Sequence, residues 1–365
     1  MSSTPLKVAF IGTGMIANTA HIPAFLNLAG DVELAAVVNP NRASAEETAR
    51  QHAIPGVYAS IEAMLAEVRP DIVTVTTPNM YHHPAVMAAL RAGAHVFCEK
   101  PAAVTVAETE EMFAAAEQAG RILYVSQTLR FQPEVQAAKE IIAAGRLGDV
   151  YYVETSAVRR RGIPTWGRFH MRAHNAGGPL FDLGVHLIDM IYWLLGNPAV
   201  QSVSGATYTR LGNRPDALPL SLAKSGAPSG ANPTRPYDYH DFDVEDLATG
   251  FIRLASGATI LLRTSWALNL PESGSTLLAG DRAGMQVSPL KLFENLGRMQ
   301  SDTQVQTPPE QSVPFSGHWH AARNLVQAIR GKEEALVKPA EVLNVMRTIE
   351  GLYRSAEHQR EERLP

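Results

Sequence analysis

Three ionisable side chains lie at helical spacing in one apolar stretch of the sequence. Asp182, His186 and Asp189 follow Gly177-Gly178-Pro179 at positions i, i+4 and i+7, a spacing that a helix places on one face. Burying a carboxylate and an imidazole is costly unless they pair or serve a site. The pattern favours a site in which His186 accepts a proton and Asp182 orients the ring or a substrate. The alternative is a structural Asp-His hydrogen bond, and no third ligand at metal-binding spacing is visible, so no metal is expected.

A lysine at a predicted sheet edge offers a second reactive group. Lys100 lies in the segment Cys98-Glu99-Lys100-Pro101, directly after the apolar run His95 to Phe97. An ammonium there can hydrogen-bond a substrate oxygen and stabilise negative charge as a hydroxyl proton leaves. Pro101 restricts Lys100 to extended geometry and permits a cis bond. We predict that Lys100 is catalytic and contacts both cofactor and substrate; a surface lysine in a turn is the alternative.

A glycine-rich turn follows the first apolar run of the chain. The segment Gly12-Thr13-Gly14-Met15-Ile16-Ala17 matches the G-x-G-x-x-A fingerprint. The first glycine permits a tight turn, the second lets the backbone approach a pyrophosphate, and the small third residue allows close helix packing. The anion then binds free N–H groups at the helix N-terminus. We predict a dinucleotide-binding loop, with a structural glycine turn as the alternative.

The end of the second predicted strand leaves the choice of dinucleotide open. A carboxylate there would hydrogen-bond the adenosine ribose of NAD, but this sequence has Asn39. Arg42 offers a partner for the 2′-phosphate of NADP, although it is as compatible with a solvated side chain. The predicted cofactor is therefore NAD or NADP. Further cofactor contacts are predicted near the third strand, where a capped helix start is the alternative, and beside the catalytic lysine: Thr77, Pro78, Asn79, His82 and Glu99.

Candidate substrate contacts come from the second half of the chain. Arg161 ends the run Arg159-Arg160-Arg161 and suits a hydroxyl-rich or anionic substrate, and Trp166 offers a flat surface to a sugar ring. Solvated arginines and core aromatics are the alternatives. Tyr237, Tyr239 and Trp266 are weaker candidates of the same kind. The Pro-, Gly- and Ser-rich stretch from Arg210 to Asp241 is predicted to be a long loop or lid.

Apolar strand-like runs alternate with helix-like stretches over the first part of the sequence. The strand-like runs are Val8 to Ile11, Glu33 to Val38, Ile72 to Thr76, His95 to Cys98 and Ile122 to Val125. The predicted helices between them are Ala20 to Ala29, Ala43 to His52, Ile61 to Glu67, Pro84 to Ala92 and Val106 to Ala119. This alternation predicts an α/β fold with a doubly wound parallel Rossmann sheet, which binds ligands beyond the carboxyl ends of its strands. The predicted dinucleotide-binding domain covers residues 1–127.

From about Val150 the pattern changes to longer strands. These are Val150 to Val158, Val200 to Thr207, Asp246 to Leu254 and Ala258 to Trp266. They predict an α+β domain with an open, mostly antiparallel sheet over residues 128–365, which binds substrate. The segment Pro339 to Glu362 has a helical pattern, and the charged run Glu357 to Arg363 is expected to be solvated.

Composition narrows the class of partner. The chain of 365 residues has a formal net charge of -4 and contains one cysteine. A negative net charge gives the protein no general attraction to nucleic acid or to an anionic membrane. One cysteine forms no intrachain disulfide and fits a reducing cytoplasm. The first apolar run is too short for a secretory signal and is expected to be a buried strand.

The motifs together resemble the Gfo/Idh/MocA oxidoreductases, the family of glucose-fructose oxidoreductase and inositol dehydrogenase. They are the glycine loop, Thr77-Pro78-Asn79, Glu99-Lys100-Pro101, Gly178 to Asp189, Arg130-Phe131, Val244-Glu245-Asp246, Gly257-Ala258 and Tyr353-Arg354-Ser355-Ala356. The resemblance implies a Rossmann domain followed by a domain whose open sheet forms a homodimer or homotetramer interface. It also implies that Lys100 matches the catalytic lysine, and that Asp182 and His186 match the family's aspartate and acid–base histidine. Asn39 departs from the acidic residue of many NAD-using members.

These observations predict an enzyme that moves a hydride between a nicotinamide cofactor and a secondary hydroxyl or ketone of a sugar, an inositol or a related polyol. Two alternatives stay open. A redox-assisted glycosidase would oxidise a sugar transiently and restore its cofactor. A cofactor-sensing protein would bind the dinucleotide without turnover, although such a sensor has no need of Lys100, Asp182 and His186.

Overall fold

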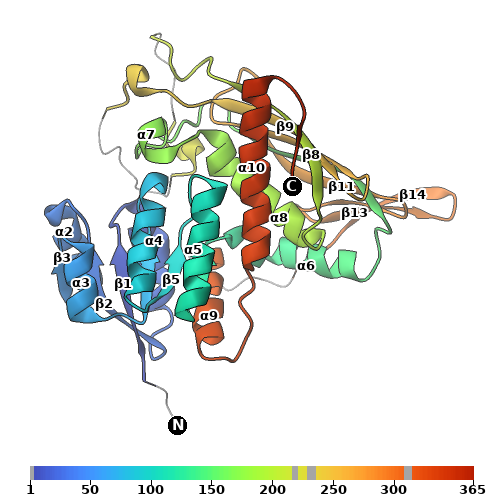
Figure 1. Cartoon of the computed structure of the whole chain (residues 1–365). Coiled ribbons are helices and arrows are strands. Elements are labelled where there is room, and N and C mark those ends of the chain that lie inside the picture. Colours follow the sequence, from blue (N-terminus) through green and yellow to red (C-terminus); the bar gives the residue numbers. More distant parts are fainter. Residues whose placement is uncertain (1–3, 216–220, 228–235, 308–314) are drawn as a thin grey trace. The chain divides into compact units, whose positions relative to one another are not determined.

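The chain divides into two compact units. A computed structural model describes residues 4–215, 221–227, 236–307 and 315–365. The first unit comprises residues 1–128 and 311–343, and the second comprises residues 129–310 and 344–365 (Figure 1). Each unit is considered by itself. The division of the sequence at residue 127 into two domains stays a prediction, because the units are defined by packing and the first takes in a later segment of chain.

The first unit is built on a parallel sheet of six strands. They are β1 (Leu6–Ile11), β2 (Val32–Val38), β3 (Gly56–Tyr58), β4 (Ile72–Val75), β5 (His95–Cys98) and β6 (Leu123–Val125), in the order β3-β2-β1-β4-β5-β6. The central strands are buried on both faces, which explains why their sequences read as continuous apolar runs. Chain order reverses at β1, so the switch point of this doubly wound sheet lies between β1 and β4. The predicted Rossmann sheet is confirmed.

Helices connect the strands of this sheet. They are η1 (Ala17–His21), α1 (Ile22–Leu26), α2 (Arg42–His52), α3 (Ile61–Val68), η2 (Asn79–Tyr81), α4 (His82–Arg91) and α5 (Val106–Ala119). Asn41, Ser60 and Thr105 cap α2, α3 and α5 by accepting a backbone N–H of the first turn. Helix α9 (Ser316–Ile329) also belongs to this unit, where it packs on α1.

The second unit contains a sheet of nine strands. They are β7 (Val150–Val158), β8 (Val200–Tyr208), β9 (Leu247–Leu254), β10 (Thr259–Ser265), β11 (Ser273–Gly280), β12 (Gly284–Gln286), β13 (Lys291–Leu296), β14 (Met299–Gln304) and β15 (Glu362–Arg363). Their order is β14-β13-β12-β11-β7-β10-β9-β8-β15. Within this sheet, as far as the described residues show, only the pair β7 and β10 is parallel. The predicted open, mostly antiparallel sheet is confirmed, and Figure 1 shows the β13–β14 hairpin extending from its end.

The second unit also contains helices and helical turns. They include η3 (Thr128–Phe131), α6 (Pro133–Ala143), α7 (Arg172–Asn175), η4 (Leu180–Gly184), α8 (Val185–Leu194), η5 (Ala223–Ser225), η6 (Tyr239–Asp241) and α10 (Pro339–His358), of which residues 344–358 belong to this unit. Both η4 and α10 contact the sheet. Gly205 of β8 and Gly250 of β9 let α10 approach the sheet, because a Cβ at either position would meet Leu352 within 3 Å. The Tyr192 hydroxyl of α8 lies 2.7 Å from the Thr348 hydroxyl of α10, which links the two helices.

A buried ion pair anchors α8. The Arg130 guanidinium donates to both carboxylate oxygens of Asp189, at 2.8 and 2.6 Å, and both side chains are buried. A bidentate pair satisfies charges that would otherwise destabilise the folded state strongly. Asp189, which shares the helical spacing of Asp182 and His186, therefore has a structural partner.

Several local features differ from the sequence-based prediction. The predicted helix Ala20 to Ala29 is a π-helical turn, η1, followed by the short α1, and strand β3 was not predicted. The last helix ends at His358 rather than Glu362. Part of the final charged run, Glu362–Arg363, pairs with β8 instead of being only solvated, because an edge strand offers free backbone groups. The predicted loop Arg210 to Asp241 includes residues 216–220 and 228–235, which lie outside the described residues.

Among the described residues, no helix has both the length and the apolar character needed to cross a bilayer.

Buried histidines of the first unit predict a loss of stability in mild acid. Burial lowers the pKa of His21 and His82, and it lowers the pKa of His95 to about 4. As pH falls below about 6.5 the unfolded chain binds protons that the folded chain does not, so the free energy of unfolding decreases between pH 6.5 and 4. After a discount for its partial exposure, His95 contributes roughly 1–2 kcal/mol to this loss.

The variant His95→Asn tests this contribution. An asparagine oxygen can replace Nδ1 of His95, which accepts the backbone N–H of Ile122 at 2.9 Å, but it does not titrate. Urea unfolding at pH 7.5 and pH 5 should show a smaller pH effect in the variant than in the wild type. Equal pH effects in the two proteins would refute a role for His95.

Candidate active site

The glycine loop after β1 has the backbone geometry of a dinucleotide cradle. Gly12 has φ +100°, and a Cβ there would lie 2.8 Å from the backbone of Thr76, so only glycine fits. A Cβ built at Gly14 meets nothing within 4 Å, which leaves the backbone of this position open to a ligand. The turn leads into η1 through Met15 and Ile16. The loop therefore fits the pyrophosphate of a dinucleotide.

Asn39 lies at the end of β2 and contacts the same loop. Its amide donates to the Thr13 hydroxyl at 2.6 Å, and its carbonyl oxygen accepts the N–H of Asn41 at 2.9 Å. The Thr13 hydroxyl also lies 2.8 Å from the hydroxyl of Ser44. This position, where an NAD enzyme of this fold places a carboxylate, thus presents a neutral network of amide and hydroxyl groups. Arg42 is exposed and pairs with Glu46 one helical turn on.

The segment after β4 contributes one unpaired polar atom. The hydroxyl of Thr77 is buried and has no hydrogen-bond partner among the described residues, which fits a group that bonds to a bound cofactor. Pro78 precedes η2, and Asn79 is buried. His82 is fully buried, with Nδ1 2.7 Å from the carbonyl oxygen of Pro101 and Nε2 3.0 Å from that of Thr77. Its ring therefore ties this segment to the one that carries Lys100, and its contact with the cofactor stays a prediction.

Lys100 follows β5 at the carboxyl edge of the parallel sheet, as predicted, and the Lys100–Pro101 bond is cis. Its backbone N–H donates to the Glu99 carboxylate at 3.1 Å. The other oxygen of Glu99 lies 2.5 Å from Nε2 of His21 and 3.3 Å from Nε2 of His318. Burial opposes ionisation of Glu99, but hydrogen bonds and charge from the two imidazoles hold its pKa well below the usual value. Glu99 is therefore a buried carboxylate.

Asp182 lies on η4 in the second unit. The indole Nε1 of Trp266 donates to Oδ2 of Asp182 at 2.9 Å, and the Arg159 guanidinium lies 3.8 Å from the same oxygen. Trp266 is fully buried, so it fixes the carboxylate instead of offering a face to a sugar. The indole N–H of Trp266 and the positive charge of Arg159 stabilise the negative charge of Asp182, whose side chain is 14% exposed. Asp182 is thus positioned to orient a neighbouring group.

His186 lies in the first turn of α8, four residues after Asp182, and is half-buried. The intervening backbone is π-helical, since the N–H of Val185 donates to the carbonyl oxygen of Leu180 five residues earlier. Such turns are rare and occur frequently at functional sites. Asp182 and His186 lie on consecutive turns of one segment in the second unit, whereas Lys100 belongs to the first unit.

Glu245 fixes the start of the segment that carries Asp182. Its carboxylate accepts the backbone N–H groups of Gly178 at 2.9 Å and Leu180 at 3.1 Å, and the Tyr353 hydroxyl at 2.7 Å. Burial raises the pKa of Glu245, although these three donors oppose the shift. A Cβ at Gly178 would lie 2.1 Å from the backbone oxygen of Glu245, so the chain cannot carry a larger residue there without moving.

The two predicted substrate contacts, Arg161 and Trp166, differ in their local partners. The Arg161 guanidinium donates to the carbonyl oxygens of Arg160 and Leu268 and to the side chain of Asn269. Trp166 is half-buried, and its Nε1 has no partner among the described residues. A direct role for either side chain in binding substrate stays a prediction.

Comparison with known proteins identifies the family. One family model, for an oxidoreductase family with an NAD-binding Rossmann fold, matches residues 6–127. A second, for the C-terminal α/β domain of the same oxidoreductase family, matches residues 139–364. The chain belongs to the Gfo/Idh/MocA oxidoreductase family. The resemblance inferred from the motifs is thereby confirmed.

Three similar proteins match nearly the whole length of this chain. The D-glucoside 3-dehydrogenase of Escherichia coli strain K12 is 31% identical over 98% of this chain and 97% of its own length. The crystal structure of the aldose-aldose oxidoreductase from Caulobacter crescentus, complexed with glycerol, is 26% identical with a TM-score of 0.78, over 99% of this chain and 100% of that one. A levoglucosan dehydrogenase in complex with NADH and levoglucosan shares the fold, with 21% identity and a TM-score of 0.83 over 99% of this chain and 100% of that one.

Sequence reasoning missed the buried groups that hold this Gfo/Idh/MocA site in place. His21, His318 and Trp266 each contact a carboxylate close to or within a predicted catalytic segment, and Glu245 caps one of these segments. Glu245 lies in the motif Val244-Glu245-Asp246, and the sequence pattern indicates for Trp266 only a flat surface against a sugar ring. Partners so distant in sequence carry no local signal, because only the tertiary fold brings them together.

Proposed function

We propose that the chain is an NAD(P)-dependent dehydrogenase that acts on a secondary hydroxyl of a sugar, an inositol or a related polyol. The observation that carries the proposal is the Asp182 carboxylate, which Trp266 holds in place on the π-helical turn that leads directly into the turn of His186. The open glycine loop supports dinucleotide binding. The printed activities of the D-glucoside 3-dehydrogenase and the aldose-aldose oxidoreductase support a sugar as substrate. A single cysteine supports a cytoplasmic location.

Each proposed catalytic residue has a distinct task. His186 accepts the proton of the substrate hydroxyl, and Asp182 orients the imidazole or the substrate. Lys100 hydrogen-bonds the same oxygen and stabilises its developing negative charge. When bound, the nicotinamide accepts the hydride from the carbon that carries this oxygen. Gly12, Thr13, Gly14, Met15, Ile16 and Thr77 would hold the dinucleotide.

A substrate panel tests the function. Sugars, inositols and glycosides are incubated with NAD or NADP, and absorbance at about 340 nm is followed together with product analysis by mass spectrometry. Dehydrogenation gives a ketone and a matching amount of reduced cofactor. Glycoside cleavage without net reduction would favour the redox-assisted glycosidase, and dinucleotide binding without product would favour a sensor.

The network around Asn39 predicts the effect of one substitution on cofactor choice. A neutral amide at this position does not repel a 2′-phosphate, and we propose that the chain accepts NADP as well as NAD. The variant Asn39→Asp should lower kcat/KM for NADP by about 10- to 100-fold, because like charges would adjoin, while kcat/KM for NAD is kept or raised. Steady-state kinetics with both cofactors measures the ratio. Asn41→Asp is the matched control, and an unchanged NADP to NAD ratio in Asn39→Asp would count against the assignment.

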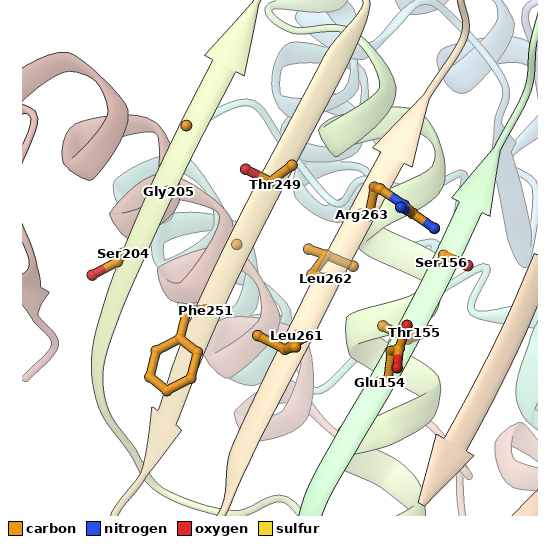
Figure 2. A pocket seen from close by; sticks show the side chains of 12 residues that line it. Glu154, Thr155, Ser156, Ser204, Gly205, Thr249, Phe251, Leu261, Leu262 and Arg263 are labelled. Carbon is orange, nitrogen blue, oxygen red and sulfur yellow. The ribbon is translucent and has the colours of Figure 1, made fainter. Parts of the chain in front are cut away.

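We further propose that the uncovered face of the second sheet joins copies of the chain into a homodimer or homotetramer. A shallow cavity of about 470 Å³ lies on β7, β8, β9 and β10 (Figure 2). Phe251 and Leu261 line it, and Leu261 is 38% exposed. The variant Leu261→Glu should shift the sedimentation coefficient toward the monomer, because association would bury the new charges. Leu296→Glu, at the exposed end of β13, is the control, and an unchanged assembly in Leu261→Glu would argue against this interface.

A further inference from the structure

A buried cluster of two histidines and one carboxylate adjoins Lys100. Glu99 is 8% exposed, His21 is fully buried, and the His318 side chain is 12% exposed. The three residues come from η1, the end of β5 and α9, and all belong to the first unit. Nε2 of each imidazole approaches the same oxygen of Glu99, at 2.5 and 3.3 Å. None of the three proposed catalytic residues, Lys100, Asp182 and His186, belongs to this cluster, so the proposed mechanism does not explain it.

Two histidines and one carboxylate can form either a metal centre or a hydrogen-bond network. Two ligand atoms on one tetrahedral zinc ion lie about 3.3 Å apart, given bonds of about 2.0–2.1 Å. The His21–Glu99 separation of 2.5 Å is shorter and corresponds to a charge-assisted hydrogen bond. A histidine that ligates through Nε2 also donates its Nδ1–H to a second group. Nδ1 of His21 has no partner among the described residues, so the geometry favours the network.

The network acts on the backbone beside Lys100. With both imidazoles donating to one oxygen of Glu99, the second oxygen accepts the N–H of Lys100. On the other side, the carbonyl oxygen of Pro101 lies 2.7 Å from Nδ1 of the buried His82. The Glu99–Lys100 peptide is therefore linked to two imidazoles through the Glu99 carboxylate, and the Pro101–Ala102 peptide, one residue beyond Lys100, lies against a third. The side chain of Lys100, to which the catalytic role is proposed, is half-buried.

We propose that Glu99, His21 and His318 are positioning residues that fix the backbone of Lys100 and thereby the placement of its ammonium. The proposal rests on the proposed catalytic role of Lys100, and it assigns Glu99 a task different from the cofactor contact predicted from sequence. A displacement of about 1 Å in a reacting group can lower a rate about 100-fold. Loss of the network should therefore reduce kcat while leaving dinucleotide affinity unchanged.

Kinetics of Glu99→Gln test this role. Its kcat should fall by about 10- to 100-fold, with KM and the dinucleotide Kd within about threefold of the wild type. His318→Ala should also lose kcat, and His318→Gln, which keeps a donor near the position of Nε2, should lose less. His83→Gln and His83→Ala provide the matched controls, because His83 lies on α4, is partly exposed and pairs with the exposed Glu111. A raised Kd with unchanged kcat in Glu99→Gln would overturn the proposal and make Glu99 a cofactor ligand.

A second measurement does not depend on turnover. Long-range ¹H–¹⁵N NMR of the wild-type protein at pH 7.5 should show His21 and His318 as Nε2–H tautomers, because both donate to Glu99. The Nδ1–H tautomer, together with stoichiometric metal by mass spectrometry, would overturn the proposal in favour of a metal centre. If no sugar is oxidised but both tautomers are as expected, the proposed function fails while the network stands. If sugars are oxidised and Glu99→Gln keeps its kcat, the positioning role alone fails.

Discussion

His186→Ala is expected to lower kcat/KM for the substrate by about 1,000-fold, the loss of a general base. His186 lies at the start of α8, where its half-buried ring adjoins the π-helical turn of Asp182. Alanine cannot accept the hydroxyl proton, and solvent water is a much weaker base. The glycine loop lies in the other unit, so the Kd of the dinucleotide should change by less than about threefold. Stopped-flow absorbance and fluorescence titration measure the two quantities.

His358→Ala serves as the control for this substitution. His358 lies at the end of α10 in the same unit, is exposed, and pairs only with Glu362 among the described residues. His358→Ala should leave kcat/KM within about twofold of the wild-type value, because an exposed ion pair contributes little to stability. Wild-type turnover in His186→Ala would remove His186 from the mechanism. Partial recovery on addition of free imidazole would support its role as a base.

Lys100→Met is expected to lower kcat by about 100- to 1,000-fold, comparable to the loss of one electrostatic stabiliser of a developing oxyanion. Methionine keeps much of the length of the lysine side chain but has neither its charge nor its three donors. The backbone contact from the Lys100 N–H to Glu99 does not depend on the side chain, so the segment should keep its conformation. Burst kinetics with the deuterated substrate would show whether hydride transfer is the slowed step.

The control for this variant is Lys332→Met, since Lys332 is exposed and lies in the same unit. It should have wild-type kcat and KM. If Lys100→Met keeps full activity with the best substrate of the panel, the electrostatic role is wrong. An increased KM with unchanged kcat would limit Lys100 to binding.

Local patterns were sufficient to predict the first sheet. Strands buried on both faces are continuous apolar runs, so β1, β2, β4, β5 and β6 were found with bounds correct to within two residues. Strand β3 was missed because its three residues are too few to form a pattern. In the second unit β7 to β10 were predicted, but β11 to β14 were not, because their faces are only partly buried and their apolar alternation is weak.

The same distinction applies to the candidate site. The glycine loop, Lys100, Asp182 and His186 were recognised because each lies in a short segment with a characteristic order of residues. The partners of these segments lie far away in sequence: Trp266 is 84 residues from Asp182, and His318 is 219 residues from Glu99. Packing alone selects such partners, since a buried carboxylate must find donors wherever the fold supplies them.

The sequence by itself determined the family, the two kinds of sheet and the residues proposed to do chemistry, because these depend on local order and periodicity. Only the tertiary structure decided that Asp189 pairs with Arg130, that Trp266 holds Asp182 and that Glu99 joins His21 and His318. The physical reason is that a buried charge is stable only with partners, and long-range folding brings those partners into contact.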